Sequence, residues 1–130
     1  KEEDITRHKM YCEEFRVSRR TVKIIQEAKE SNRKIVAVGT TSCRVLETIS
    51  NIEVDKFNNY IYQGSTNLFI YPGYKFKLID GIITNFHFPK TTLFMLVCAL
   101  AGRDLIMKAY QEAIAKKYRF YSYGDAMLII

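Results

Sequence analysis

The amino-acid sequence predicts an α/β fold, in which a layered sheet is flanked by helices. Three observations support this prediction. A helical pattern is followed by a short apolar run within residues 18–38, an aromatic and β-branched stretch with turn dipeptides occupies residues 51–88, and two more helical patterns lie within residues 89–117. Alternation of helical and strand patterns is typical of helices packed on a sheet. A length of 130 residues fits a single domain.

The first helix is expected to begin after Ser18, a residue type that caps helices. Val22, Ile25 and Ala28 then recur at helical spacing and form an apolar stripe. Residues 31–32 (Ser-Asn) should end this helix, because both residue types favour turns over helix interiors.

A strand and a second helix are expected next. Residues 35–38 (IVAV) form a continuous apolar run, which is the pattern of a strand covered on both faces. Residues 39–42 (GTTS) follow as a small polar turn, and residues 44–49 again have a helical pattern. The order of strand, turn and helix favours the α/β class.

Strands should dominate residues 51–88. Pro72-Gly73 suits the central positions of a type II turn, and Asp80-Gly81 is a hairpin dipeptide. Between them, residues 74–79 (YKFKLI) alternate aromatic or aliphatic side chains with lysines up to Leu78, which predicts a half-exposed strand.

Two helices and a strand should complete the chain. Pro89 fits the start of a helix, and Thr91-Thr92 can help to cap it. Gly102 should stop that helix and Asp104 should cap the next one. Residues 120–123 and 126–130 are strand-like, with a Gly-Asp turn between them.

Composition indicates an ordered protein with a preference for anionic partners. Apolar residues make up 48% of the chain, and the net charge is +6. Cys12, Cys43 and Cys98 are widely separated, which argues against a disulfide framework and against a zinc site. The longest apolar run, residues 93–101, is shorter than the roughly 18 residues of a membrane span. We therefore expect a soluble cytoplasmic protein without a metal or a membrane partner.

Small polar residues after the predicted strand could form an anion site. Gly39 allows a tight turn, and Thr40, Thr41 and Ser42 would place hydroxyls beside the N–H groups of a helix start. A carboxylate or phosphate would suit such a site. The alternative is ordinary helix capping by Thr and Ser. Arg44 is then either a second contact to the anion or a solvated side chain.

A titratable pair precedes the long apolar helix. In a strand, Asn85 and His87 would point to the same side, next to the helix start expected near Pro89. His87 could be a packed, hydrogen-bonded residue or a group that transfers protons. Convergence of an imidazole and an amide on a helix N-terminus favours a site.

Aromatic and basic residues gather in two further stretches. Tyr71, Tyr74, Lys75 and Lys77 could stack a base and contact phosphates, or could form an aromatic hairpin with solvated lysines. Arg119 lies among three tyrosines and leaves the same two alternatives open. Asp125 would orient a partner or form an Asx-turn.

Four stretches of the sequence, taken together, resemble one family. They are HKM at residues 8–10, VGTTSCRVLE at residues 38–47, LFIYPGYKFKLIDGIITNFHFPKTTLFMLV at residues 68–97 and YRFYSYGDAMLI at residues 118–129. These stretches are similar to the S-adenosylmethionine:tRNA ribosyltransferase-isomerases. The likeness extends over nearly the whole chain and keeps the order and spacing of the motifs.

The resemblance implies a function in queuosine synthesis. The ribosyl moiety of S-adenosylmethionine would be transferred to 7-aminomethyl-7-deazaguanine at the tRNA wobble position and isomerised, giving epoxyqueuosine, adenine and methionine. S-adenosylmethionine is then a co-substrate, and no prosthetic group is expected. Family members have an α/β domain with an inserted β-barrel. The chain would be roughly the final third of such an enzyme, a portion of the α/β domain that is inactive alone, with the oligomeric state left open.

For the chemistry that the resemblance implies, we predict roles for the candidate residues. His87 would be the general acid or base and Asn85 its hydrogen-bonding companion, with His8 a lesser candidate. Residues Gly39, Thr40, Thr41, Ser42 and Arg44 would hold the methionine carboxylate or a tRNA phosphate. Tyr71 and Tyr74 would line the donor or base pocket, and Lys75, Lys77 and Arg119 would contact tRNA. Two alternatives remain: a non-catalytic tRNA-binding module, and an unrelated α/β enzyme that binds a free nucleotide.

Overall fold

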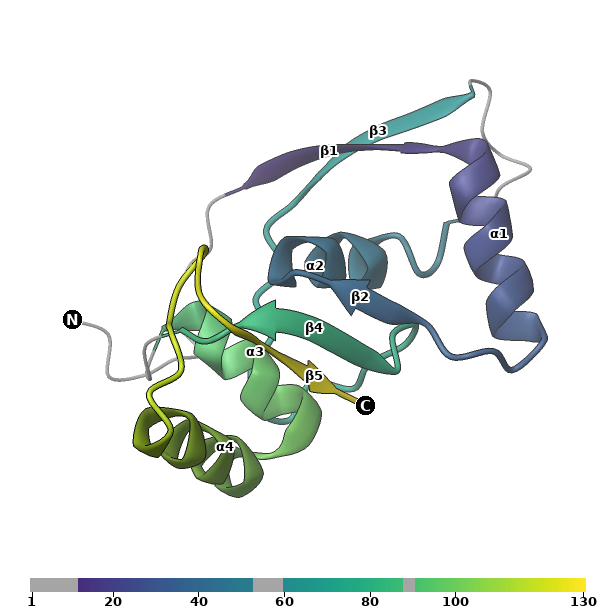
Figure 1. Cartoon of the computed structure of the whole chain (residues 1–130). Helices are drawn as coiled ribbons and strands as arrows, with labels where there is room; N and C mark the ends of the chain where they lie inside the picture. Colours follow the sequence, from purple (N-terminus) through teal and green to yellow (C-terminus); the bar gives the residue numbers. More distant parts are fainter. Residues whose placement is uncertain (1–11, 53–59, 88–90) are drawn as a thin grey trace.

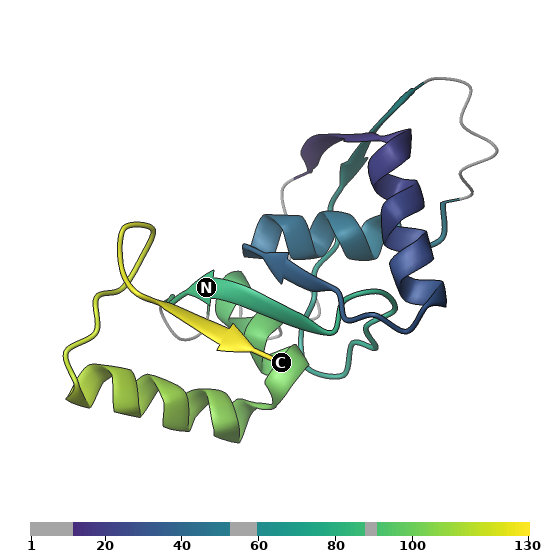
Figure 2. The same cartoon turned by 45° about the vertical axis from the view of Figure 1, so that its right-hand side comes forward.

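The computed structural model describes residues 12–52, 60–87 and 91–130, which form two small sheets with helices packed against them. In chain order the elements are β1 (Glu13–Ser18), α1 (Arg19–Glu30), β2 (Val36–Val38), α2 (Thr40–Thr48), β3 (Ile61–Thr66), β4 (Gly81–Asn85), α3 (Thr92–Ala101), α4 (Arg103–Ala115) and β5 (Ala126–Ile129). Figures 1 and 2 show α2 between the two sheets, with α3 and α4 beside the larger one. The expectation of an α/β fold is confirmed.

The larger sheet is mixed and has the strand order β2-β4-β5. Strand β2 runs parallel to β4, and β5 runs antiparallel to it. The smaller sheet pairs β1 with β3 in antiparallel orientation. Because β2 and β4 are parallel neighbours, their carboxyl ends reach the same edge of the larger sheet.

Helices cover one face of the larger sheet. Ala37 and Ile82 point into a core that also contains Cys43 of α2, Phe94 of α3 and Tyr110 of α4. All five side chains are buried. The run Leu96–Cys98 of α3 is buried as well, so the apolar helix forms the centre of this core.

The other face of the larger sheet is apolar and open to solvent. Val38 is 67% exposed and Leu128 is 56% exposed. The expectation that residues 35–38 form a strand covered on both faces is therefore wrong within the described residues. Strand β2 lies at the sheet edge, and only the side of Ala37 has a helix over it.

Local signals for α1 are confirmed. The Ser18 hydroxyl accepts a hydrogen bond from the Thr21 N–H at 3.0 Å and caps the helix. Val22 is buried and packs with Ile49 in a second, smaller core cluster beneath the β1-β3 sheet. The helix ends before Ser31, as expected from the sequence.

Signals for α3 and α4 are confirmed in part. The Thr91 hydroxyl accepts a hydrogen bond from the Phe94 N–H and caps α3, and Gly102 ends it. The expectation that Asp104 caps α4 is wrong, because α4 begins at Arg103 with Gly102 as its cap. Asp104 lies in the first turn, where a negative charge is favoured by the helix dipole. Pro89 lies outside the described residues.

A buried carboxylate organises the segment before β4. Glu47 on α2 is 3% exposed. Its Oε1 accepts hydrogen bonds from the Tyr74 hydroxyl and the Lys77 N–H, both at 2.8 Å. Its Oε2 accepts from the N–H groups of Leu78 and Ile79 at 2.9 and 3.0 Å. Four donors therefore compensate the desolvation of one carboxylate.

This arrangement corrects two expectations about the same region. Residues 74–79 do not form a strand, because the N–H groups of three successive residues turn to one carboxylate instead of alternating between neighbouring strands. Asp80-Gly81 is not a hairpin, since Gly81 begins β4. A Cβ at Gly81 would lie 2.4 Å from the Ile129 carbonyl oxygen, so the glycine permits close approach of β5. The turn at Pro72-Gly73 is confirmed by a hydrogen bond from the Tyr74 N–H to the Tyr71 carbonyl.

Strand-like residues near the end of the chain divide into a loop and a strand. Residues 126–129 form β5, as expected. Residues 120–123 form turns, not a strand. Their hydrogen bonds close a loop between α4 and β5, which is described below with the candidate site.

We predict that Glu47→Gln destabilises the chain by about 2–4 kcal/mol, because an amide nitrogen would face backbone N–H donors that the carboxylate now accepts from. Urea unfolding followed by circular dichroism measures the change. The matched control is Glu112→Gln, because the ion pair of Glu112 with Lys116 is exposed to solvent and its loss should leave the unfolding midpoint nearly unchanged. Equal unfolding midpoints for the two variants would show that the Glu47 contacts contribute no more to stability than an exposed ion pair does.

We also predict that Cys43 resists alkylation at pH 8 while Cys12 reacts. Burial, followed by the nearby charge of Glu47, raises the pKa of the Cys43 thiol to about 12, so little thiolate is present. Cys12 is exposed. Mass spectrometry after timed treatment with iodoacetamide reports both sites. Labelling of Cys43 at the rate of Cys12 in the folded chain would contradict this buried environment.

Candidate functional site

Predicted site residues meet at the carboxyl ends of β2 and β4. Val38 pairs with Ile83, and the Gly39 N–H continues the pairing by donating to the Ile83 carbonyl at 2.8 Å. In Figure 1 both arrows point to the same side of the molecule. The Gly39–Ser42 turn therefore lies beside the end of β4, where Asn85 and His87 follow. Ligands of α/β proteins commonly bind at this edge.

Polar groups at the start of α2 face this edge. The helix begins at Thr40 with Gly39 as its cap and has no side-chain cap hydrogen bond. The interpretation of Thr40, Thr41 and Ser42 as ordinary capping residues is therefore wrong. Thr40 is buried, whereas Thr41 and Ser42 are exposed. The first N–H groups of a helix such as α2 lack partners within the helix, which is the geometry that anions prefer.

His87 is half-buried and fixed at two points. Its backbone N–H donates to the Tyr110 hydroxyl at 2.8 Å, and its Nε2 lies 3.2 Å from the Thr84 hydroxyl. Burial lowers the pKa of His87 below its ordinary value of 6.5. The imidazole is therefore mainly neutral at pH 7 and can accept a proton.

Asn85 is held by a different part of the molecule. Its amide nitrogen donates to the carbonyl of Asp125 at 3.1 Å and lies 3.5 Å from the carbonyl of Gly124. The expectation that Asn85 and His87 share one side is wrong, because β4 ends at Asn85 and His87 turns back toward Thr84. Thr84, not Asn85, is the hydrogen-bonding companion of His87.

Sequence reasoning missed Thr84. Its side chain is 6% exposed and lies on the buried side of β4, with Ile82. A polar residue at a core position of a strand, three residues before a histidine, is the signal that could have identified it. A hydroxyl both donates and accepts, so Thr84 can hydrogen-bond either tautomer of the imidazole.

The loop between α4 and β5 adjoins this site. The Tyr121 N–H donates to the Phe86 carbonyl at 3.0 Å. Asp125 accepts from the Arg119 N–H at 2.7 Å and pairs with its guanidinium at 3.2 Å. The first of these bonds and then the second lower the pKa of Asp125. Asp125 therefore closes the loop internally, and Arg119 keeps an exposed side chain.

Arg44 lies in the interior, not in solvent. It is 4% exposed, pairs through Nη1 with Glu13 of β1 and donates from Nε to the Leu68 carbonyl at 2.9 Å. The alternative of a solvated side chain is therefore wrong. Its Nη2 has no hydrogen-bond partner among the described residues. The other expectation, that Arg44 holds an anion, stays a prediction.

Tyr71 and Tyr74 are part of the packed interior. Tyr74 packs edge-to-face on Phe76 at 5.0 Å, and Tyr71 packs on Phe69 at 5.0 Å. Burial, and then the hydrogen bond to Glu47, raises the pKa of Tyr74. Its hydroxyl is thus committed to the protein, and its ring packs on Phe76.

The lysines of the same segment are solvated. Lys75 and Lys77 are exposed, and the Lys77 ammonium lies 5.8 Å from the Tyr74 ring centre. Both can contact an anionic partner without loss of an ion pair within the described residues.

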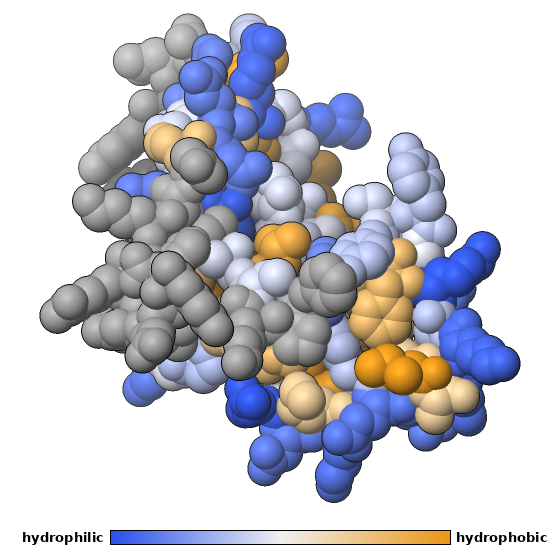
Figure 3. Space-filling model, turned by 90° about the vertical axis from the view of Figure 1, so that its left-hand side faces the viewer, coloured by the Kyte–Doolittle hydropathy of each residue, from blue (hydrophilic) through white to orange (hydrophobic). Residues whose placement is uncertain are grey.

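The face that contains the ends of β2 and β4 is uneven. Figure 3 views the molecule from the side to which both arrows of Figure 1 point, and outside the grey area this face carries both apolar and hydrophilic side chains.

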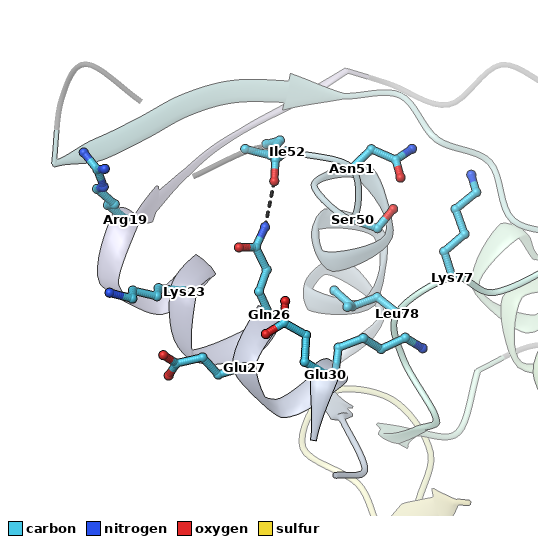
Figure 4. A pocket seen from close by; sticks show the side chains of 11 residues that line it. Arg19, Lys23, Gln26, Glu27, Glu30, Ser50, Asn51, Ile52, Lys77 and Leu78 are labelled. Carbon is cyan, nitrogen blue, oxygen red and sulfur yellow. Dashed lines mark hydrogen bonds between the residues drawn. The ribbon is translucent and has the colours of Figure 1, made fainter. Parts of the chain in front are cut away.

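A separate cleft of about 720 Å³ lies between α1 and the end of α2. Figure 4 shows Gln26 reaching across it to the Ile52 carbonyl, a hydrogen bond of 2.7 Å. Its lining has both signs of charge, and of the predicted site residues only Lys77 contributes. The cleft is therefore distinct from the candidate site at the β2 and β4 ends.

The described residues contain neither a metal-binding cluster nor a membrane-spanning helix. Within residues 12–52, 60–87 and 91–130, no group of three or more His, Cys, Asp or Glu side chains could hold a metal ion. In the same ranges no helix has the length and apolar character needed to cross a membrane. His8 lies outside the described residues.

Comparisons with known proteins agree with the motif pattern. Residues 1–129 match the family described as queuosine biosynthesis protein. The S-adenosylmethionine:tRNA ribosyltransferase-isomerase of Thermotoga petrophila is 50% identical over 130 residues, which is the whole of this chain and 38% of that protein. The protein of the same name from Halothermothrix orenii is 54% identical over 128 residues, or 98% of this chain and 37% of that protein.

A solved structure shows the same fold. The crystal structure of S-adenosylmethionine tRNA ribosyltransferase from Thermotoga maritima matches with a TM-score of 0.80 and 50% identity, over 90% of this chain and 40% of that one. The chain thus spans well under half the length of the relatives that it matches. Since the family match extends over nearly every residue, the chain belongs to the queuosine biosynthesis protein family.

Proposed function

We propose that the chain is part of an S-adenosylmethionine:tRNA ribosyltransferase-isomerase. The complete enzyme would transfer the ribosyl moiety of S-adenosylmethionine to 7-aminomethyl-7-deazaguanine at the tRNA wobble position and isomerise it, releasing adenine and methionine. The observation that carries this proposal is identity of 50–54% over essentially the whole chain to proteins of that name. With these substrates, we place the protein in the cytoplasm.

We propose that this chain is one part of a larger enzyme. The match covers 38% of the length of the Thermotoga petrophila protein, so we assign the chain to a portion of the α/β domain of an enzyme that also has a β-barrel. The exposed apolar face with Val38 and Leu128 fits a sheet that has further partners. Without them, the isolated segment should have little or no activity.

His87 is our candidate for proton transfer. The reaction requires a base that removes a proton beside the sulfonium, and adenine must be protonated or hydrogen-bonded as it leaves. A neutral, half-buried imidazole can remove the proton, and once protonated it can donate a proton or a hydrogen bond to the leaving adenine. Thr84 would orient the ring through its contact with Nε2.

We propose that the anionic parts of the substrates bind at the start of α2 and to basic side chains. The methionine carboxylate or a tRNA phosphate would contact the N–H groups and hydroxyls of residues 39–42 and Arg44. Exposed Lys75, Lys77 and Arg119 would contact tRNA phosphates. The rings of Tyr71 and Tyr74 would line the donor or base pocket.

Release of adenine tests the proposal against its alternatives. The full-length protein is incubated with S-adenosylmethionine and tRNA that carries the 7-aminomethyl base, and free adenine is measured by chromatography. Adenine release that requires this tRNA supports the proposal. Salt-sensitive tRNA binding without adenine indicates a binding module, and binding of a free nucleotide without tRNA indicates an unrelated nucleotide-binding enzyme.

We predict that His87→Ala in the full-length enzyme lowers the rate of adenine release by about 10²-fold or more, as expected for a lost proton-transfer group. In the parent enzyme, the rate should fall as the pH drops through the lowered pKa of His87, below 6.5, because protonation removes the base. Initial rates between pH 5 and 8 test this. Unchanged turnover in a folded His87→Ala enzyme would assign His87 to packing alone.

We predict that Thr84→Val lowers the same rate by about 10-fold and that Thr84→Ser restores most of it, because only the hydroxyl can orient the imidazole. The pH profile separates orientation from packing. Loss of the hydroxyl should shift the acid limb of the Thr84→Val profile, whereas a packing defect would lower the rate equally at every pH. A Thr84→Ser enzyme as slow as Thr84→Val would contradict the assignment.

A further inference from the structure

The loop between α4 and β5 exposes three tyrosines beside the candidate site. Tyr118, Tyr121 and Tyr123 are 48%, 46% and 99% exposed. The Tyr123 side chain has no hydrogen bond or ring contact among the described residues. An aromatic ring with its full surface in water gains free energy when another planar group covers it.

Hydrogen bonds within this loop close its backbone, so the backbone positions of its tyrosines are defined. The Asp125 N–H donates to the Arg119 carbonyl at 2.8 Å, the Arg119 N–H donates back to the Asp125 carboxylate at 2.7 Å, and the Gly124 N–H donates to the Tyr121 carbonyl at 2.9 Å. A Cβ at Gly124 would lie 2.4 Å from the Arg119 carbonyl oxygen, so the turn closes too tightly for any side chain there.

The same loop is anchored directly to the end of β4. Tyr121 bonds to the Phe86 carbonyl, Asn85 bonds to the Asp125 carbonyl, and Phe120 stacks on Phe86 at a centroid distance of 5.1 Å. Phe86 is the residue before His87. The loop backbone that carries the exposed tyrosines is therefore held close to the residues that precede His87.

Basic residues lie next to these tyrosines in the sequence. Lys116, Lys117 and Arg119 lie within four positions, and all are exposed. Glu112 and Asp125 pair with two of them, so this group of five residues keeps a net charge of +1 (three cations minus two carboxylates). Exposed aromatic rings with neighbouring cations are a combination by which proteins hold unpaired bases and their phosphates.

We propose that the loop of residues 118–125 stacks an unpaired base of the tRNA anticodon loop that neighbours the base being modified, with Tyr123 as the stacking ring. This inference rests on the proposed function. The mixture of lysines, Arg119 and Ser122 with the tyrosines favours a nucleic acid over a second protein surface, because protein interfaces are depleted in lysine.

Binding of an RNA hairpin with the anticodon loop sequence tests this in the full-length protein. Tyr123→Ala should weaken binding by about 5- to 100-fold, the range for loss of one base–aromatic stack, while Tyr123→Phe should bind like the parent protein. Tyr60→Ala is the matched control, since Tyr60 is 88% exposed and directly precedes β3, a strand of the smaller sheet that Figure 1 shows apart from α4 and β5.

Binding of S-adenosylmethionine and the thermal midpoint should be the same in all four proteins. Unchanged hairpin affinity of Tyr123→Ala, in a parent protein that releases adenine, would overturn this inference and leave the proposed function intact. A parent protein that neither binds the hairpin nor releases adenine would overturn both. A lowered thermal midpoint with unchanged RNA affinity would show that Tyr123 contacts the rest of the polypeptide instead.

Discussion

The buried carboxylate of Glu47 is the constraint on which the arrangement of the larger sheet depends. A desolvated negative charge is tolerated only with several donors, and here the donors are the N–H groups of residues 77–79 and the Tyr74 hydroxyl. These bonds fix the segment that enters β4 against α2. Because α2 itself follows β2, the same bonds also fix where β4 begins relative to β2.

Helix α2 connects the two sheets through two charged residues three positions apart. Arg44 reaches Glu13 of β1, and Glu47 reaches the residues before β4. Positions i and i+3 of a helix lie on neighbouring parts of its surface, so one short helix can hold both sheets. The start of α2 is thereby fixed beside the end of β4, and this brings Gly39 close to the residues that precede His87.

Sequence patterns predicted the features whose causes are local. The Ser18 cap and the end of α3 at Gly102 depend on residues within one helical turn. Residues 74–79 have the alternating apolar pattern of a strand but do not form one. The N–H groups of residues 77–79 bind Glu47, which is about 30 residues away in the sequence, so the local pattern could not reveal this contact. The buried ion pair of Arg44 depends on a distant strand in the same way. At the candidate site, the sequence identified His87 but not its partner, since hydrogen-bond partners depend on where β4 ends.

Adjacent residues at the end of β4, Thr84 and Asn85, contact different parts of the molecule. Thr84 lies on the buried side and contacts the imidazole, whereas Asn85 lies on the other side and holds the loop that ends at Asp125. An amide committed to a carbonyl cannot also follow a proton on His87, but a hydroxyl can reverse its hydrogen bond when the imidazole changes its protonation state. A shift of β4 by one residue would exchange these positions, so the register with β2 determines which side chain contacts the imidazole and which holds the loop.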